Sequence, residues 1–245
     1  MTLVLARRAD PKPPDVNPKH RVVGIIGGMG PEATVDLMRR VVAKTPAHDD
    51  QDHIHLIVES NPKIPSRIAH LIEGTGADPT PELIRIAANL QRAGAEALAI
   101  PCNTAHAYAH SIRRAVSIPL LDMIDLTVAQ IAGSPRNARV GLLASSAVIA
   151  TELYAKAFSS HGIAVVLPPH QEDVMNLIKA VKRGDTGLQA QTALSRIALD
   201  LAKQADVLLI GCSELSVIAA AVTVPFVDSL DVQAEAIVKF AASAA

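Results

Sequence analysis

The chain has 245 residues, a net charge of −1, and only two cysteines, with two tyrosines, three phenylalanines and no tryptophan. Two widely separated thiols exclude a disulfide framework, a four-cysteine zinc site and a CxxC redox pair. The balance of 23 basic against 24 acidic residues leaves no excess of positive charge for phosphates, and 2% aromatics provide no stacking platform for bases. We therefore expect no nucleic-acid partner. With no apolar run long enough for a membrane span or a signal peptide, we expect a cytoplasmic protein with reduced cysteines.

Residues 1–20 are rich in proline and charge, which predicts a flexible tail. From Arg21 on, short β-branched segments alternate with longer segments of helical periodicity. The predicted strands are Val22–Ile26, Ile54–Val58, Ala97–Ile100, Val140–Leu143, Ile163–Leu167 and Val207–Ile210, and the clearest helices are Pro31–Lys44, Pro81–Ala93 and Leu188–Lys203. This order predicts an α/β fold of parallel strands with helices on both faces, and an active site beyond the carboxyl ends of the strands.

The chain also contains an internal repeat. Val23–Ile26 is echoed by Val140–Leu143, and Gly94–Cys102 is echoed by Gln204–Cys212. Each cysteine is followed by a helical stretch and then by the pattern Pro-x-x-Asp-x-x-Asp, which begins once at Pro119 and once at Pro225. The repeat predicts two pseudo-symmetric, doubly wound, flavodoxin-like lobes with the active site in the cleft between them. We assign residues 21–118 and 226–245 to lobe 1, and residues 119–225 to lobe 2.

Both cysteines lie where a strand ends and a helix begins. At such a point free backbone N–H groups and the helix dipole favour a thiolate, which predicts a lowered thiol pKa. A free cysteine is also commonly a small buried hydrophobe, and this alternative applies to Cys102 and Cys212 when each is taken alone. Their placement at matched points of a repeat favours the functional interpretation, because lobes that face each other would put the two thiols on opposite sides of one ligand.

Two opposed thiols suit the inversion of a stereocentre. One thiolate removes a proton from carbon, and the other thiol returns a proton to the opposite face, with no formal need for a metal or an organic cofactor. Asn103, Thr104 and Ser213 follow the cysteines at the predicted helix starts, where side chains and backbone N–H groups can bind a carboxylate. Ordinary N-capping explains the same residues equally well.

Three segments resemble signatures of the aspartate/glutamate racemase family, most closely its aspartate racemase branch. They are Gly27–Thr34, Pro101–His106 and Gly211–Leu215, and the resemblance extends from Arg21 to the C-terminus. It implies a cofactor-independent amino-acid racemase that forms a homodimer, with Cys102 and Cys212 as the acid/base pair.

The resemblance also implies the substrate contacts. The segment Asn61–Arg67 resembles the loop whose arginine binds the side-chain carboxylate of the substrate, and Ala180–Gly184 resembles a segment whose lysine meets the substrate. The predicted substrate-binding residues are Met29, Asn61, Arg67, Asn103, Thr104, Ser145, Lys182 and Ser213, with no metal site and no cofactor. The family often has threonine where this chain has Ser145 and Ser213. Guanidinium and ammonium groups are suitable partners for carboxylates. The expected substrate is aspartate in the first place and glutamate in the second.

Several alternatives remain at the level of sequence. Gly28–Ala33 satisfies a dinucleotide-binding pattern, but the acidic residue expected about 20 positions later is missing. His106 and His110 have the helical spacing of a metal pair without an evident third ligand, so we expect His106 to support the cleft and His110 to lie on the surface. Other activities are cis-trans isomerisation or decarboxylation of a small dicarboxylic acid, or carboxylate binding without catalysis.

Overall fold

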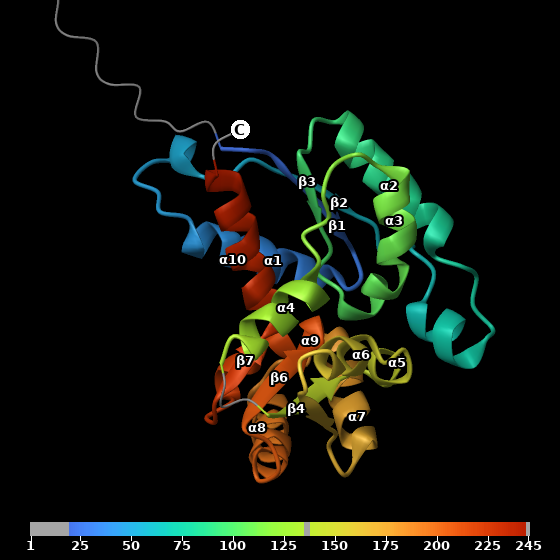
Figure 1. The fold of residues 1–245 in the computed structure, drawn as a ribbon, viewed down its shortest axis with the longest axis vertical. Coiled ribbons are helices and arrows are strands. Elements are labelled where there is room, and N and C mark those ends of the chain that lie inside the picture. Colours follow the sequence, from blue (N-terminus) through green and yellow to red (C-terminus); the bar gives the residue numbers. More distant parts are fainter. Residues whose placement is uncertain (1–19, 135–137, 244–245) are drawn as a thin grey trace, which may run out of the picture.

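The computed structural model describes residues 20–134 and 138–243, and it contains two α/β lobes (Figure 1). The first sheet has the order β2-β1-β3, and Leu120 extends it through a bridge to Leu98. The second sheet has the order β5-β4-β6-β7, and every pairing in both sheets is parallel. The strands are β1 (Val23–Gly27), β2 (Leu56–Ser60), β3 (Ala97–Ala99), β4 (Arg139–Ala144), β5 (Ala164–Val166), β6 (Val207–Gly211) and β7 (Phe226–Asp228). The predicted α/β architecture of two parallel-sheet lobes is confirmed, whereas the predicted tail lies outside the described residues apart from His20.

The helices cover both faces of each sheet. They are α1 (Pro31–Lys44), α2 (Thr80–Arg92), α3 (Ala109–Ala115), α4 (Met123–Ala132), α5 (Ser146–Ala150), α6 (Leu153–Ser159), α7 (Gln171–Lys182), α8 (Leu188–Ala202), α9 (Ser213–Ser216) and α10 (Ser229–Ala242). Short turns of other helix types span Asp50–Asp52, Ala69–Glu73, Asn103–Tyr108 and Ala219–Ala221. None of the helices in the described ranges has the length and apolar character needed to cross a membrane.

Alternation along the first strand of each lobe divides the core into two layers. In β1, Val23 and Ile25 pack with α1 and α10, whereas Ile26 packs with α2 on the other face. In β4, Val140 and Leu142 pack with α4 and α6, whereas Leu143 packs with α7 and α8. Both faces of both sheets are therefore buried, which explains why the strands read as continuous apolar runs in the sequence.

Two equivalent glycines support the predicted duplication. A Cβ atom on Gly24 would lie 2.9 Å from the Cβ of Ala95, beneath the end of α2. A Cβ atom on Gly141 would lie 2.8 Å from Leu201 Cγ and 3.0 Å from the Cβ of Ala205, beneath the end of α8. Each lobe thus uses a glycine at the same place to bring a helix close to its central strand.

The last helix of each half packs on the sheet of the other half. Helix α4 follows the Leu120 bridge of the first sheet but joins the apolar cluster of β4. Helix α10 follows β7 of the second sheet but joins the apolar cluster of β1, and α4 and α10 contact each other (Figure 1). Strand β7 pairs with β6 of the second sheet, whereas α10, which follows it, packs on the first. Likewise Leu120 lies beside the first sheet, whereas α4, which follows it, packs on the second.

Candidate active site

A cavity with about 50 Å³ of free space lies between the two lobes. From the first lobe it is lined by Met29, Ser66, Arg67, Ile68, Cys102 and Thr104, and from the second by Ser145, Ile178, Lys182, Cys212 and Glu214. Both cysteines of the chain therefore contribute to one cavity, as the repeat predicted, and both are free thiols. The lining combines two thiols, three hydroxyls, two cations and one carboxylate.

The turn that carries Cys102 is fixed by a buried histidine. Cys102 ends the segment after β3 and precedes the 3₁₀ turn Asn103–Tyr108. The backbone N–H of Met123 donates to His106 Nε2 at 3.1 Å, so the neutral ring carries its proton on Nδ1 and donates it to the Cys102 carbonyl oxygen at 3.0 Å. Burial is the main reason that the pKa of His106 is lowered. His106 thus supports the Cys102 turn as a neutral group, as expected, and His110 is exposed.

The turn that carries Cys212 is fixed by a carboxylate. The Cys212 thiol donates to Glu214 Oε2 at 3.1 Å, and Glu214 Oε1 lies 3.4 Å from Lys182 Nζ. Burial, followed by the negative charge of Glu214, raises the pKa of Cys212 well above its ordinary value. The sequence-based expectation of a lowered pKa is therefore wrong for Cys212. Helix α9 has only four residues, and its N-terminus does not outweigh desolvation and a carboxylate in direct contact.

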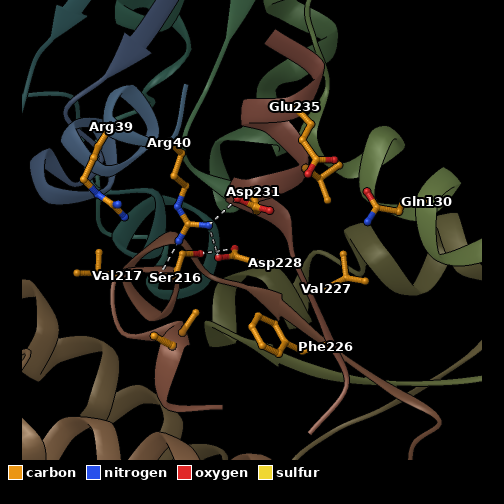
Figure 2. Close-up of a pocket in the computed structure, with 13 residues that line it drawn as sticks. Arg39, Arg40, Gln130, Ser216, Val217, Phe226, Val227, Asp228, Asp231 and Glu235 are labelled. Atoms are coloured by element: carbon orange, nitrogen blue, oxygen red, sulfur yellow. Dashed lines mark hydrogen bonds and ion pairs between the residues drawn. The ribbon is translucent and has the colours of Figure 1, made fainter. Parts of the chain in front are cut away.

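A buried ion-pair network lies behind the Cys212 turn (Figure 2). Arg40 of α1 donates to Asp36 at 2.8 Å, to Asp228 at 2.7 Å and to the carbonyl oxygen of Ser216 at 2.8 Å. The Ser216 hydroxyl donates to Asp228 at 2.6 Å. A cavity of about 370 Å³ borders this network, but neither cysteine lines it, and its charged side chains pair with one another or with Asp36 and Lys44. The network anchors helix α9 to the first lobe.

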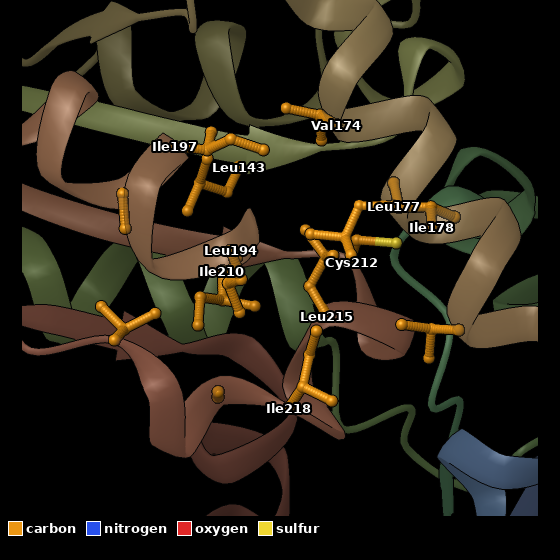
Figure 3. Packing of buried hydrophobic residues seen from close by; sticks show 14 of the residues in the cluster. Leu143, Val174, Leu177, Ile178, Leu194, Ile197, Ile210, Cys212, Leu215 and Ile218 are labelled. Carbon is orange, nitrogen blue, oxygen red and sulfur yellow. The ribbon is translucent and has the colours of Figure 1, made fainter. Parts of the chain in front are cut away.

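The other side of the Cys212 turn is apolar. Cys212 lies at the edge of the cluster that α7 and α8 form with the second sheet, next to Leu177, Ile178 and Leu215 (Figure 3). Its side chain is only 6% exposed. Cys212 is therefore both a member of the core, which was the alternative interpretation of the sequence, and a part of the cavity wall.

The two predicted cations, Arg67 and Lys182, both line the cavity but have different partners. Arg67 Nη1 donates to the carbonyl oxygens of Pro65, at 2.9 Å, and Ile64, at 3.3 Å. Among residues 20–134 and 138–243, no carboxylate forms an ion pair with Arg67. Lys182 is about half exposed and faces Glu214. Met29, Thr104 and Ser145 also line the cavity as predicted, and the hydroxyls of Thr104 and Ser145 meet across the lobes at 3.3 Å.

Three predicted contacts are not part of the cavity lining. Asn61 donates to Glu82 at 2.6 Å. Asn103 donates to Ser229 at 3.1 Å and accepts from the Tyr154 hydroxyl at 2.6 Å, so its amide links the lobes beneath the site. Ser213 is 2% exposed, and its hydroxyl has no hydrogen-bond partner in the described part of the chain. The side chains of Asn103 and Ser213 are buried, whereas that of Asn61 is partly exposed beside Glu82.

Sequence reasoning missed Ser66, Ile68, Ile178 and Glu214. Ser66 and Ile68 flank the predicted arginine, and Ile178 precedes Lys182 by one helical turn, so these three follow from residues already chosen. Glu214 lies two positions after Cys212 within a recognised motif. A carboxylate this close to a thiol was the available signal, because like charges at short range change the ionisation of both groups.

The other ligand sites suggested by the sequence find no support in the structure. A Cβ atom on Gly28 would lie 2.4 Å from the carbonyl carbon of Asn61, so this glycine allows two loops to pack together. That close approach explains the glycine without a dinucleotide. In the described parts of the chain, no three His, Cys, Asp or Glu side chains are grouped closely enough to hold a metal.

These features define a two-lobed α/β protein with paired thiols in a small polar site. The profile of the Asp/Glu/Hydantoin racemase family matches residues 26–237. The broad specificity amino-acid racemase RacX of Bacillus subtilis is 26% identical over 215 residues, which cover 85% of this chain and 92% of RacX. An aspartate racemase from Picrophilus torridus is 32% identical, with a TM-score of 0.82 over 90% of this chain and 94% of that one.

A glutamate racemase from Francisella tularensis, solved in complex with D-glutamate, shares the fold, with a TM-score of 0.61 at 18% identity over 89% of this chain and 80% of that one. The chain belongs to the Asp/Glu/Hydantoin racemase family. It is therefore an isomerase of the racemase type, as the sequence motifs predicted.

Proposed function

We propose that this protein racemises an acidic amino acid, aspartate in the first place and glutamate in the second, by proton transfer between Cys102 and Cys212. The observation that carries the proposal is that the two cysteines line one cavity from opposite lobes. Arg67 lines the same cavity and forms no ion pair with a carboxylate of the described residues. The site thus has an acid/base group on either side and a free cation for the substrate.

The proposed reaction needs one thiolate and one thiol. The thiolate of one cysteine takes the α-proton, so that the C–H bond breaks and an S–H bond forms. The thiol of the other cysteine gives its proton to the opposite face of the α-carbon, which inverts the centre. The cavity must stabilise negative charge on the substrate between these steps, and Arg67 and Lys182 supply positive charge at its wall.

The charges of the lining favour a dicarboxylic amino acid. Arg67 and Lys182 provide two positive charges, and Glu214 provides one negative charge. An aspartate or glutamate zwitterion carries two carboxylates and one ammonium group, which is the complementary set. The cavity has room for only a few waters in this structure, and we expect the lobes to move apart to admit a substrate and to close again to exclude solvent.

Incubation with L-aspartate in D₂O tests the proposal. We expect deuterium at the α-carbon together with formation of D-aspartate, and the same experiment with L-glutamate ranks the two substrates. Failure to exchange with any acidic amino acid in a panel would contradict the proposal. Release of carbon dioxide or isomerisation of an unsaturated diacid would support the alternative activities, and binding without turnover would support a carboxylate-binding role.

Alanine substitution tests the role of the thiols. We expect Cys102→Ala and Cys212→Ala each to reduce racemisation by about 10³-fold or more, because one-sided proton transfer cannot invert the centre. Chiral analysis of the product measures the loss, and unchanged thermal unfolding would show that each variant is folded. A single variant that racemises near the wild-type rate would refute the two-thiol mechanism. Sedimentation of the pure protein tests the homodimer that the family resemblance implies.

A further inference from the structure

The two cysteine turns differ at one position that lines the cavity. Two residues after Cys102 stands Thr104, whose hydroxyl faces Ser145 at 3.3 Å. Two residues after Cys212 stands Glu214, whose carboxylate accepts a hydrogen bond from the Cys212 thiol at 3.1 Å. No carboxylate of the described chain accepts a hydrogen bond from Cys102. The pseudo-symmetric lobes therefore place an anion beside only one of their two thiols.

Glu214 is held in place as a charged group of the site. Its side chain is largely buried, and Lys182 lies 3.4 Å from Oε1. Among the described residues Oε1 accepts no hydrogen bond, although it is buried. Oε2 is therefore committed to the thiol, whereas Oε1 makes only a loose ion pair.

We propose that Glu214 keeps Cys212 protonated in the resting enzyme, so that the resting form acts on the enantiomer whose α-proton faces Cys102, with Cys102 as the base and Cys212 as the proton donor. The inference rests on the two-cysteine reaction proposed above. A thiolate on Cys212 would lie in hydrogen-bond range of a carboxylate in a desolvated site, and this repulsion opposes loss of the proton. The positive charges that face the cavity, Lys182 and Arg67, act in the opposite direction, and Lys182 is already paired with Glu214.

The protonation states of both cysteines can be followed through one turnover from this resting form. Cys102 begins as a thiolate and takes the α-proton, while Cys212 gives its own proton to the opposite face of the α-carbon. The product leaves an enzyme with a Cys102 thiol and a Cys212 thiolate, which is the form that acts on the opposite enantiomer. Exchange with water then returns a proton to Cys212 and removes one from Cys102. Glu214 favours this return, because it stabilises the protonated form of Cys212.

Titration of a single cysteine tests the role of Glu214 without substrate. In a Cys102→Ala background Cys212 is the only cysteine, so the ultraviolet absorbance of its thiolate reports its ionisation alone. Burial raises the pKa of both tyrosines, that of Tyr108 to about 12, which leaves the thiolate signal clear at lower pH. We expect Glu214→Gln to lower the midpoint by about one pH unit or more. Glu235→Gln, which removes an exposed carboxylate paired with Lys44, should leave it unchanged.

An unchanged midpoint in folded Glu214→Gln would overturn the proposal. Should that variant not fold, Lys182→Met provides the second test, because loss of the neighbouring cation should raise the midpoint; no rise there would equally overturn it. In otherwise unmodified enzyme, Glu214→Gln should also move the alkaline limb of kcat/KM to lower pH. The alkaline limb must shift by the same amount for the L and the D enantiomer, because the ratio of their kcat/KM values equals the equilibrium constant of racemisation, which is one at every pH. A merely structural role would lower kcat/KM without moving the limb.

The titration does not depend on the proposed activity. If the D₂O experiment shows no exchange but the midpoint of Cys212 responds to Glu214→Gln, then the contact is as proposed and the reaction is not. If exchange occurs but the midpoint does not respond, then the racemase stands and the role of Glu214 fails.

Discussion

The Cys102 and Cys212 turns occupy equivalent places in two duplicated lobes, yet they are held by different chemistry. A neutral, buried histidine fixes the Cys102 turn through the Cys102 carbonyl oxygen and the Met123 N–H. Charged groups fix the Cys212 turn, with Glu214 on the thiol and Arg40 on the carbonyl oxygen of Ser216. Duplication thus preserved the placement of the thiols and not their surroundings. The two-thiol reaction proposed above would use this asymmetry, because it needs one cysteine as a thiolate and the other as a thiol.

The largest effect should come from the arginine behind the Cys212 turn. The side chain of Arg40 is 13% exposed and pairs with Asp36 and Asp228, whereas Arg113, which pairs with Asp122, the first-half equivalent of Asp228, and with Asp125, is 44% exposed. We expect Arg40→Met to lower the free energy of unfolding by about 3–5 kcal/mol, because it leaves the buried carboxylate of Asp228 without a cation, whereas Asp36 keeps its ion pair with Arg39. Arg113→Met is the matched control and should cost about 1 kcal/mol or less. Chemical denaturation measures both, and equal losses would show that the greater burial of the Arg40 ion pairs adds nothing to stability.

The next effect concerns the link between the Cys102 turn and the second lobe. Tyr154→Phe removes the hydroxyl that donates to Asn103 at 2.6 Å, and we expect a loss of about 1–3 kcal/mol because the buried amide oxygen loses its donor. Tyr108→Phe is a suitable control, since the Tyr108 hydroxyl is buried without a hydrogen-bond partner in the described ranges. Thermal unfolding of both variants tests the link. A Tyr108→Phe variant as unstable as Tyr154→Phe would contradict it.

The neutral histidine makes a pH-dependent contribution. His106 has a lowered pKa in the folded protein, whereas an exposed histidine titrates near 6.5, so below about pH 6.5 the unfolded chain binds more protons. The stabilisation is thus complete above about pH 6.5 and is lost as the pH falls towards the folded pKa. Its size is about 1.4 kcal/mol for each unit between the two pKa values. In His106→Gln the stability should fall less on acidification, and parallel curves for the two proteins would refute the assignment.

The fold and the pair of cysteines were predictable from the sequence because both depend on local patterns. Alternating β-branched and helical segments give the two sheets, and the repeat places Cys102 and Cys212 at matched strand ends. The lobe boundaries drawn from the sequence assign Met123–Ala132 to lobe 2 and Ser229–Ala242 to lobe 1, and in the structure α4 packs with β4 and α10 packs with β1. The pKa of Cys212 was misjudged. Position at a helix start can be read from a sequence, but desolvation and the direction of the Glu214 side chain cannot.

The smallest effect should come from the residue that follows Cys212. Ser213 and Asn103 are equivalent in the repeat, and the sequence suggested a substrate contact for both. The Asn103 amide is committed to Tyr154 and Ser229, whereas the Ser213 hydroxyl is buried without a partner in the part of the chain described. An unsatisfied buried hydroxyl does not stabilise a protein, so Ser213→Ala should change the free energy of unfolding by less than about 1 kcal/mol.

Kinetics of the same variant decide whether Ser213 meets the substrate when the lobes move. An unchanged KM would show that Ser213 only fills space behind Cys212. A raised KM with an unchanged kcat would show that the hydroxyl binds substrate in a state more open than this one, because such a change removes binding that ground state and transition state share. In that case the unpaired hydroxyl is a group held ready for the ligand, and the Cys212 turn would carry both a binding contact and the resting proton.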